Sequence, residues 1–122
     1  SSLNYLGLEN KVSRDPEDLK KADHIILPGV GAYGDAIAKL RGSGMAEPLL
    51  EEARAGKPIM GICLGMQLLF DKSYEYGEYK GLGLINGDIV SMKDNLKNKK
   101  LNRINEHIYK YCNTFIENFK LD

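Results

Sequence analysis

The residues best suited to chemistry are Gly61-Ile62-Cys63-Leu64-Gly65. A nucleophile framed by two glycines at this spacing is typical of an elbow, the tight turn that joins a strand to a helix. The framing positions must lack side chains because neighbouring backbone passes close to the turn. The helix that follows would also favour the thiolate, which is the reactive form of cysteine. The alternative is a buried structural cysteine, which most free cysteines are, but the two glycines favour the nucleophile.

A second candidate is the glycine-rich segment 27–34, Leu-Pro-Gly-Val-Gly-Ala-Tyr-Gly. Gly29, Gly31 and Gly34 match the spacing of a dinucleotide-binding loop. That reading also needs an acidic residue at the end of the next strand, where the sequence has Cys63 instead. A plain structural turn remains open. In the functional interpretation, the glycines let backbone N–H groups point at an oxyanion that forms beside the cysteine.

Three segments together resemble class I glutamine amidotransferases: Pro28-Gly29-Val30-Gly31, Gly61-Ile62-Cys63-Leu64-Gly65-Met66-Gln67-Leu68-Leu69-Phe70 and Gly81-Leu82-Gly83-Leu84-Ile85. The similarity covers about residues 1–90, and it is greatest to the member of the class that serves histidine biosynthesis. The resemblance implies that Cys63 attacks the side-chain amide of glutamine and forms a glutamyl thioester and ammonia. It also implies that no cofactor is needed, and that the ammonia passes to a (β/α)8 cyclase subunit, bound as a heterodimer partner, which makes imidazole glycerol phosphate.

The resemblance also assigns roles around the cysteine. Backbone N–H groups near Val30 or Gly31 and at Leu64 would hold the oxyanion. Bound glutamine would contact Gly29, Gly31 and Gln67, although Gln67 as an ordinary helix residue remains open.

The chain departs from this family in two places. Thioester chemistry needs a base, normally a histidine oriented by a carboxylate, and the family supplies both in a His-Pro-Glu motif that this sequence lacks. His107 is best interpreted as a solvated helix residue, and His24 opens a strand at the end opposite Cys63. The family's first strand is also expected to be missing ahead of residue 1. A non-catalytic remnant or interaction module of the same fold is therefore the alternative, and a peptidase or DJ-1-like cysteine-elbow protein is a weaker one.

Alternating strands and helices must position these residues. Apolar runs predict strands at 24–27 and 58–62, and the patterns between and after them predict helices at 33–40, 46–55 and 66–70. An N-cap and first-turn proline predict a further helix at 15–22 after an extended piece at 11–14, and 82–92 reads as strand or hairpin. This order predicts an α/β fold, a flavodoxin-like open, mostly parallel sheet flanked by helices, incomplete here.

The composition changes after residue 92. We expect a partial amidotransferase domain at 1–92, a basic linker at 93–100 and a divergent helical tail at 101–122. The tail repeats apolar residues at the spacing of one helix face, which predicts a C-terminal amphipathic helix; these residues are Leu101, Ile104, Ile108, Tyr111, Phe115 and Phe119. A frameshift, a fusion and a natural divergent ending are all compatible with this change.

Charge and cysteine content exclude several classes. Seventeen basic residues balance seventeen acidic ones, so nucleic acid and anionic membranes are not expected partners. Neither an apolar run of about 18 residues nor a signal peptide is present, so we expect a cytoplasmic protein. Cys63 and Cys112 lack metal-ligand spacing, and neither a metal site nor a disulfide is predicted.

Overall fold

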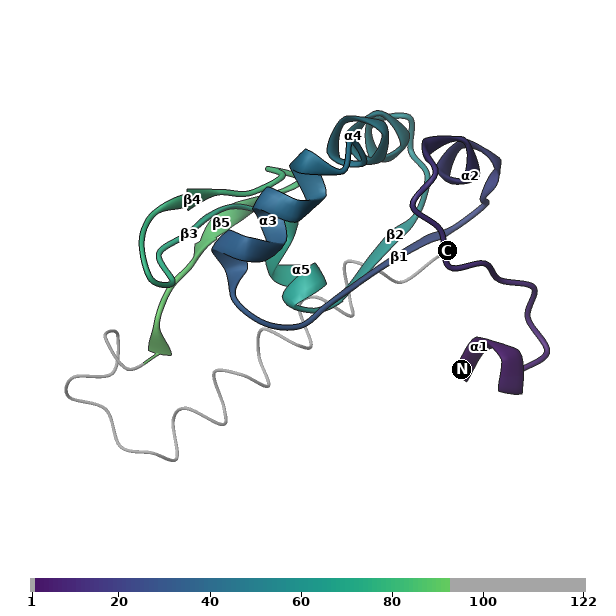
Figure 1. Cartoon of the computed structure of the whole chain (residues 1–122), viewed down its shortest axis with the longest axis horizontal. Helices are drawn as coiled ribbons and strands as arrows, with labels where there is room; N and C mark the ends of the chain where they lie inside the picture. The colour runs from purple at the N-terminus through teal and green to yellow at the C-terminus, as the bar shows by residue number, and fades with distance from the viewer. Residues whose placement is uncertain (1, 93–122) are drawn as a thin grey trace.

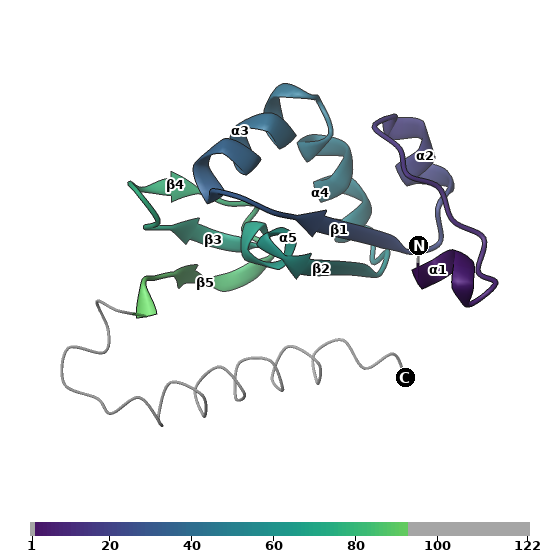
Figure 2. The ribbon, with the colours of Figure 1, turned by 60° about the horizontal axis from the view of Figure 1, so that its bottom comes forward.

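Two short sheets carry the fold of this chain, whose computed structural model describes residues 2–92. The first sheet is a parallel pair, β1 (Ile25–Gly29) and β2 (Ile59–Cys63). The second has the order β4-β3-β5, with β3 parallel to β5 and antiparallel to β4. Its strands are β3 (Phe70–Ser73), β4 (Tyr79–Lys80) and β5 (Ile85–Ile89). The helices are α1 (Ser2–Tyr5), α2 (Pro16–Lys21), α3 (Tyr33–Gly42), α4 (Ala46–Arg54) and α5 (Leu64–Leu68) (Figure 1, Figure 2).

The first sheet is built by the order β1, α3, α4, β2, in which helices return the chain to a parallel neighbour. Ile25 and Ile59 begin the two strands opposite each other, and both are buried. Helices α2 and α4 lie on one side of this pair (Figure 1), and α5 leaves the end of β2 directly. The core gathers between these elements; its buried apolar residues are Ile25, Tyr33, Ile37, Ala46, Leu49, Leu50, Ile59, Leu64, Leu68, Leu69 and Leu82.

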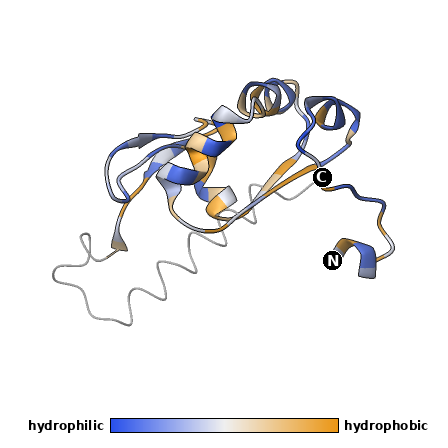
Figure 3. Cartoon of the chain, in the orientation of Figure 1, coloured by the Kyte–Doolittle hydropathy of each residue, from blue (hydrophilic) through white to orange (hydrophobic). Residues whose placement is uncertain are grey.

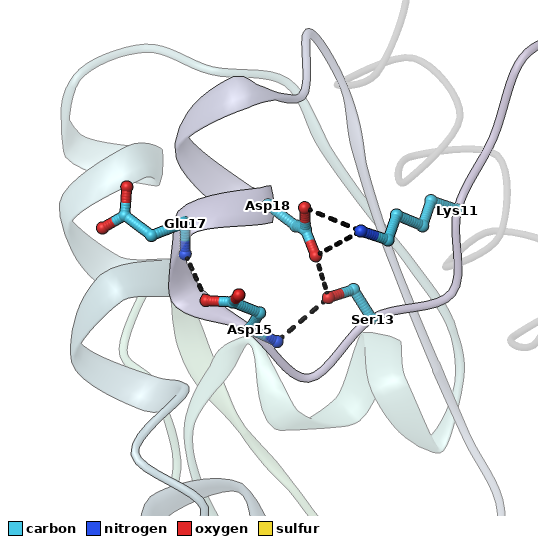
Figure 4. A network of polar contacts seen from close by, with 5 residues as sticks. All are labelled: Lys11, Ser13, Asp15, Glu17 and Asp18. Atoms are coloured by element: carbon cyan, nitrogen blue, oxygen red, sulfur yellow. Dashed lines mark hydrogen bonds and ion pairs between the residues drawn. The ribbon is translucent and has the colours of Figure 1, made fainter.

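A polar network begins helix α2 (Figure 4). Asp15 is the N-cap, and its carboxylate accepts a hydrogen bond from the backbone N–H of Glu17 at 3.0 Å. The hydroxyl of Ser13 donates to the carboxylate of Asp18 and accepts from the N–H of Asp15 at 3.0 Å. Lys11 adds an ion pair to Asp18 at 3.1 Å. The start of α2 is therefore fixed by side chains from the extended segment before it.

Lys57 ties the end of α2 to the chain that enters β2. Its ammonium donates to the carbonyl oxygens of Leu19 at 2.6 Å and Lys20 at 2.9 Å. The same ammonium forms an ion pair with Glu52 of α4 at 2.8 Å. A cation at this position satisfies carbonyls that the helix end leaves unpaired, and it connects the end of α2 with α4.

The expected α/β fold is confirmed, with corrections in its details. The helix expected at 66–70 begins at Leu64 and ends at Leu68, because Phe70 already belongs to β3. The extended piece at 11–14 pairs with no strand of residues 2–92, and the strands form two sheets rather than one. The linker and the tail at 93–122 lie outside the described residues. Within residues 2–92, no helix has the length and apolar character needed to cross a bilayer.

Candidate functional site

Cys63 sits at a strained turn between β2 and α5. It closes the strand and is the N-cap of the helix, with φ 57° and ψ −122°. Positive φ is unusual for a residue with a side chain and costs on the order of 1–3 kcal/mol, so the surrounding structure must hold it there. The side chain is exposed and the thiol is free. A strained, accessible cysteine at a strand-to-helix turn is the geometry of a nucleophile elbow.

Gly61 and Gly65, the two glycines around Cys63, let neighbouring backbone approach the turn closely, as the sequence predicts. A β-carbon built on Gly61 would lie 2.5 Å from the Cα of Met66, in the helix that doubles back over the strand. One built on Gly65 would lie 1.8 Å from the carbonyl oxygen of Leu27 in β1. Both distances are far below van der Waals contact. The elbow therefore holds its shape only because these two positions carry no side chain.

The glycine loop lies directly beside the elbow. Gly29, the last residue of β1, is opposite Cys63 in the register of the parallel pair. A β-carbon on Gly29 would meet the backbone nitrogen of Gly65 at 2.8 Å, so the start of the loop rests on α5. Beyond it, Val30 is 90% exposed and Gly31 has φ 97°, a conformation that glycine adopts at little cost. The structure thus brings the loop and the thiol to the same edge of the sheet.

The other residues singled out in the sequence lie on α5. Leu64 is its first residue, and its side chain is buried, which leaves only its backbone for contact with a substrate. Gln67 is half-buried and lies in α5, four residues after Cys63. Leu64 follows the cysteine directly in the chain, and Gln67 lies in the helix that begins there.

Glu75 is a neighbour of this site that the sequence does not reveal. Its carboxylate accepts a hydrogen bond from the backbone N–H of Tyr33 at 3.4 Å, at the start of α3 where the glycine loop ends. The N–H of Glu75 in turn donates to the hydroxyl of Ser73 at 3.1 Å, and Ser73 is fully buried. Glu75 therefore links the β3–β4 connection to the end of the glycine loop. Its one signal in the sequence is that it is an acid among tyrosines.

The comparisons with known proteins agree with this geometry. A model of the CobB/CobQ-like glutamine amidotransferase domain matches residues 2–115. The chain belongs to this glutamine amidotransferase family. Its similarity to a solved structure titled "Crystal structure of glutamine amidotransferase" has a TM-score of 0.62 at 24% identity and covers 81% of this chain and 51% of that one. That likeness establishes the amidotransferase fold.

Curated relatives of this amidotransferase chain carry the name imidazole glycerol phosphate synthase subunit HisH. The one from Wolinella succinogenes is 53% identical over 90 residues, which are 74% of this chain and 44% of the relative. The one from Sulfurimonas denitrificans is 54% identical over 86 residues, 70% of this chain and 42% of the relative. The one from Lactococcus lactis is 51% identical over 92 residues, which are 75% of this chain and 46% of the relative. The amidotransferase chain thus spans less than half the length of these relatives.

The histidines of this amidotransferase chain are His24 and His107. His24 immediately precedes β1 and lies at the end of the strand pair opposite Cys63. His107 lies outside the described residues. Within residues 2–92, no three side chains of histidine, cysteine, aspartate or glutamate form a group that could bind a metal ion. The chemistry that the described residues support therefore rests on the thiol and on backbone donors.

Proposed function

We propose that this chain forms a glutamyl thioester on Cys63 as the glutaminase part of an imidazole glycerol phosphate synthase. The observation that carries the proposal is the register of β1 and β2, which puts Gly29 opposite Cys63 and starts the glycine loop beside the strained thiol. A nucleophile and a flexible row of backbone N–H groups at one sheet edge are what acyl transfer requires.

The reaction follows from these parts. The thiol of Cys63 loses its proton to solvent, the thiolate sulfur attacks the side-chain amide carbon of glutamine, and the carbonyl oxygen becomes an oxyanion. Backbone N–H groups near Val30 or Gly31 and at Leu64 stabilise that charge. The tetrahedral species collapses when the amide nitrogen takes a proton and leaves as ammonia, with the carbon still bonded to sulfur. Water then attacks the thioester, which gives glutamate and restores the thiol.

Binding of glutamine is assigned to the residues around the elbow. Gly29 and Gly31 would let the backbone of the loop approach the substrate closely. The amide of Gln67 has both a donor and an acceptor to offer the substrate. In the synthase, the ammonia would pass to a (β/α)8 cyclase subunit bound as a heterodimer partner. The names of the curated relatives support this assignment.

A second candidate is a non-catalytic remnant or interaction module of the same fold. The position of His24 favours it, because that imidazole lies at the wrong end of the strand pair to take a proton from Cys63 or to activate water. The two candidates differ in turnover. An enzyme completes both halves of the reaction, whereas a chain without a base stops at or before the thioester.

Labelling with a diazoketone analogue of glutamine tests the first half-reaction. We expect one equivalent of label on the full chain by intact mass, none on Cys63→Ala, and full labelling on Cys112→Ala, the matched control at the other cysteine. Equal labelling of both variants, or none of the parent chain, would overturn the assignment of Cys63.

Glutamate release from glutamine, measured with and without the cyclase subunit, tests the second half-reaction, the hydrolysis of the thioester. Partner-dependent release that is lost in Cys63→Ala supports the enzyme. Labelling at Cys63 without any release supports the remnant.

A further inference from the structure

The exposed part of the glycine loop is held mainly by the two elements that it joins. Val30 is 90% exposed, and a β-carbon built on Gly31 would meet nothing within 4 Å among the described residues. At one end of the loop, Gly29 of β1 packs against the backbone of Gly65. At the other end, the chain enters the first turn of α3. The position of the loop over the thiol therefore depends on how that turn is held.

The first turn of α3 is held by residues distant in sequence. Its N-cap is Ala32, which makes no side-chain cap hydrogen bond. The next residue, Tyr33, is fully buried, and its N–H donates to Glu75. A β-carbon built on Gly34 would lie 2.6, 2.8 and 2.9 Å from three ring carbons of Tyr79. The outer edge of that ring therefore packs directly on the backbone of Gly34, in space that any side chain there would occupy.

Tyr79 belongs to a segment that contacts both helices of the candidate site. It lies in β4, and the carbonyl oxygen of Gly81 just after this strand accepts a hydrogen bond from the guanidinium of Arg41 in α3 at 3.0 Å. The N–H of Leu82 donates to the carbonyl oxygen of Leu68, the last residue of α5, at 2.9 Å. Helix α3 lies beside β4 (Figure 2) and carries both polar and apolar residues along its length (Figure 3). Segment 79–82 thus joins the helix that follows the loop to the helix that begins at the thiol.

We propose that Tyr79 is a positioning residue of the glutaminase site. Its ring holds the first turn of α3 at Gly34, and thereby places the backbone N–H groups of Val30 and Gly31 where an oxyanion forms beside Cys63. This inference rests on the proposed function and adds to it a residue that acts through the loop, without contact to the substrate.

Two reagents that modify Cys63 separate the position of the loop from the reactivity of the thiol. The diazoketone analogue of glutamine carries a ketone in the place of the amide carbonyl, so its rate depends on the backbone donors of the loop. Methyl methanethiosulfonate has no carbonyl group, and its rate depends on the exposure and ionisation of the thiol. Both rates are measured on the full chain by peptide mapping, which distinguishes Cys63 from Cys112.

Tyr79→Ala removes the ring. We expect the rate of diazoketone labelling at Cys63 to fall about tenfold, because a misplacement of about 1 Å can cost up to about a hundredfold in rate. The rate with methyl methanethiosulfonate should equal that of the parent chain. Tyr79→Phe keeps the ring and should keep both rates. The matched control is Tyr76→Ala, since Tyr76 is 88% exposed between β3 and β4, and it should also leave both rates unchanged.

Gly34→Ala tests the same contact from the other side, and it keeps the proposal testable if Tyr79→Ala fails to fold. The added methyl group should displace the ring and lower the diazoketone rate as much as Tyr79→Ala does, although alanine favours a helix more than glycine. Added to Tyr79→Ala, it should cause no further loss, because the ring is already absent.

The outcomes distinguish this inference from the function on which it rests. A loss confined to the diazoketone, shared by Tyr79→Ala and Gly34→Ala and absent from Tyr79→Phe, supports the positioning role. Diazoketone rates in the two alanine variants equal to that of the parent would refute that role and leave the proposed function intact. Equal losses with both reagents would refute it too, because the defect would then lie in the thiol. A parent chain that is not labelled at Cys63 would contradict the proposed function, and this inference with it.

Discussion

A β-carbon built on Gly65 would lie 1.8 Å from the carbonyl oxygen of Leu27, so the backbones of α5 and β1 pack directly against each other. This contact fixes the distance between the two halves of the candidate site. Leu27 is the first residue of the glycine-rich segment 27–34, and Gly65 follows Cys63 by two residues. The contact between α5 and β1 therefore sets the position of the glycine loop relative to the thiol of Cys63.

Gly65→Ala should accordingly be among the most damaging single changes in the chain. We expect the free energy of unfolding to fall by about 3 kcal/mol, the upper end of what overpacking costs, because backbone must move to admit the methyl group. Gly42→Ala is the matched control. A β-carbon at Gly42 meets nothing within 4 Å at the end of α3, so this change should be neutral or stabilising by up to about 1 kcal/mol. Urea unfolding measures both, and equal effects would contradict the close contact.

The strain at Cys63 gives a prediction that separates stability from chemistry. Cys63→Gly should be more stable than Cys63→Ala by about 1 kcal/mol, because relief of strain of about 1–3 kcal/mol is partly offset by the entropy glycine loses on folding, about 0.5–1 kcal/mol. Both variants should lose all labelling by the diazoketone. Urea unfolding of the two gives the comparison. Equal stability would mean that the positive φ at this position carries no cost.

The sequence predicts the local part of this fold well and its long-range part poorly. The apolar runs of β1 and β2 and the glycine turn at Cys63 are local signals, and the structure bears them out. The sequence does not predict β3, because Phe70–Ser73 contains no apolar run. This strand forms by pairing with β5, where Phe70 lies opposite Ile85, fifteen residues later. Pairings between distant segments depend on tertiary packing, which the local periodicity of apolar residues does not reveal.

The contact between Glu75 and Tyr33 illustrates the same limit at the candidate site. The two residues are 42 positions apart, and only the folded chain brings them together. The elbow and the glycine loop could be recognised because each is a short motif. Glu75 has no motif, and its place beside the loop follows from the course of β3 and from the buried hydroxyl of Ser73.

Glu75 should act as a positioning residue for the glycine loop. Glu75→Ala removes the acceptor for the N–H of Tyr33, and we expect the rate of diazoketone labelling at Cys63 to fall about three- to tenfold, since one hydrogen bond contributes about 0.5–1.5 kcal/mol. Glu75→Gln keeps an amide oxygen that can accept the same bond, and it should restore most of the rate. The matched control is Glu78→Ala, which removes an exposed ion pair to Lys72 and should leave the rate unchanged. Equal losses in the alanine and glutamine variants would argue for a role of the charge rather than of the hydrogen bond.

The network at the start of α2 predicts how stability depends on pH. The hydrogen bond from Ser13, followed by that from Lys11, lowers the pKa of Asp18 below its ordinary value of 3.8. Because the folded state holds this carboxylate in its charged form, the network stabilises the fold fully above about pH 4 and loses that effect as the pH falls through the lowered pKa. Asp18→Asn should therefore reduce the decline in the free energy of unfolding between about pH 4 and pH 2, measured by urea unfolding at each pH. Asp23→Asn, an exposed acid in the turn after α2, is the matched control and should leave the decline as in the parent chain. If stability declines as steeply in Asp18→Asn as in the parent chain, the network does not lower the pKa of Asp18 in the folded state.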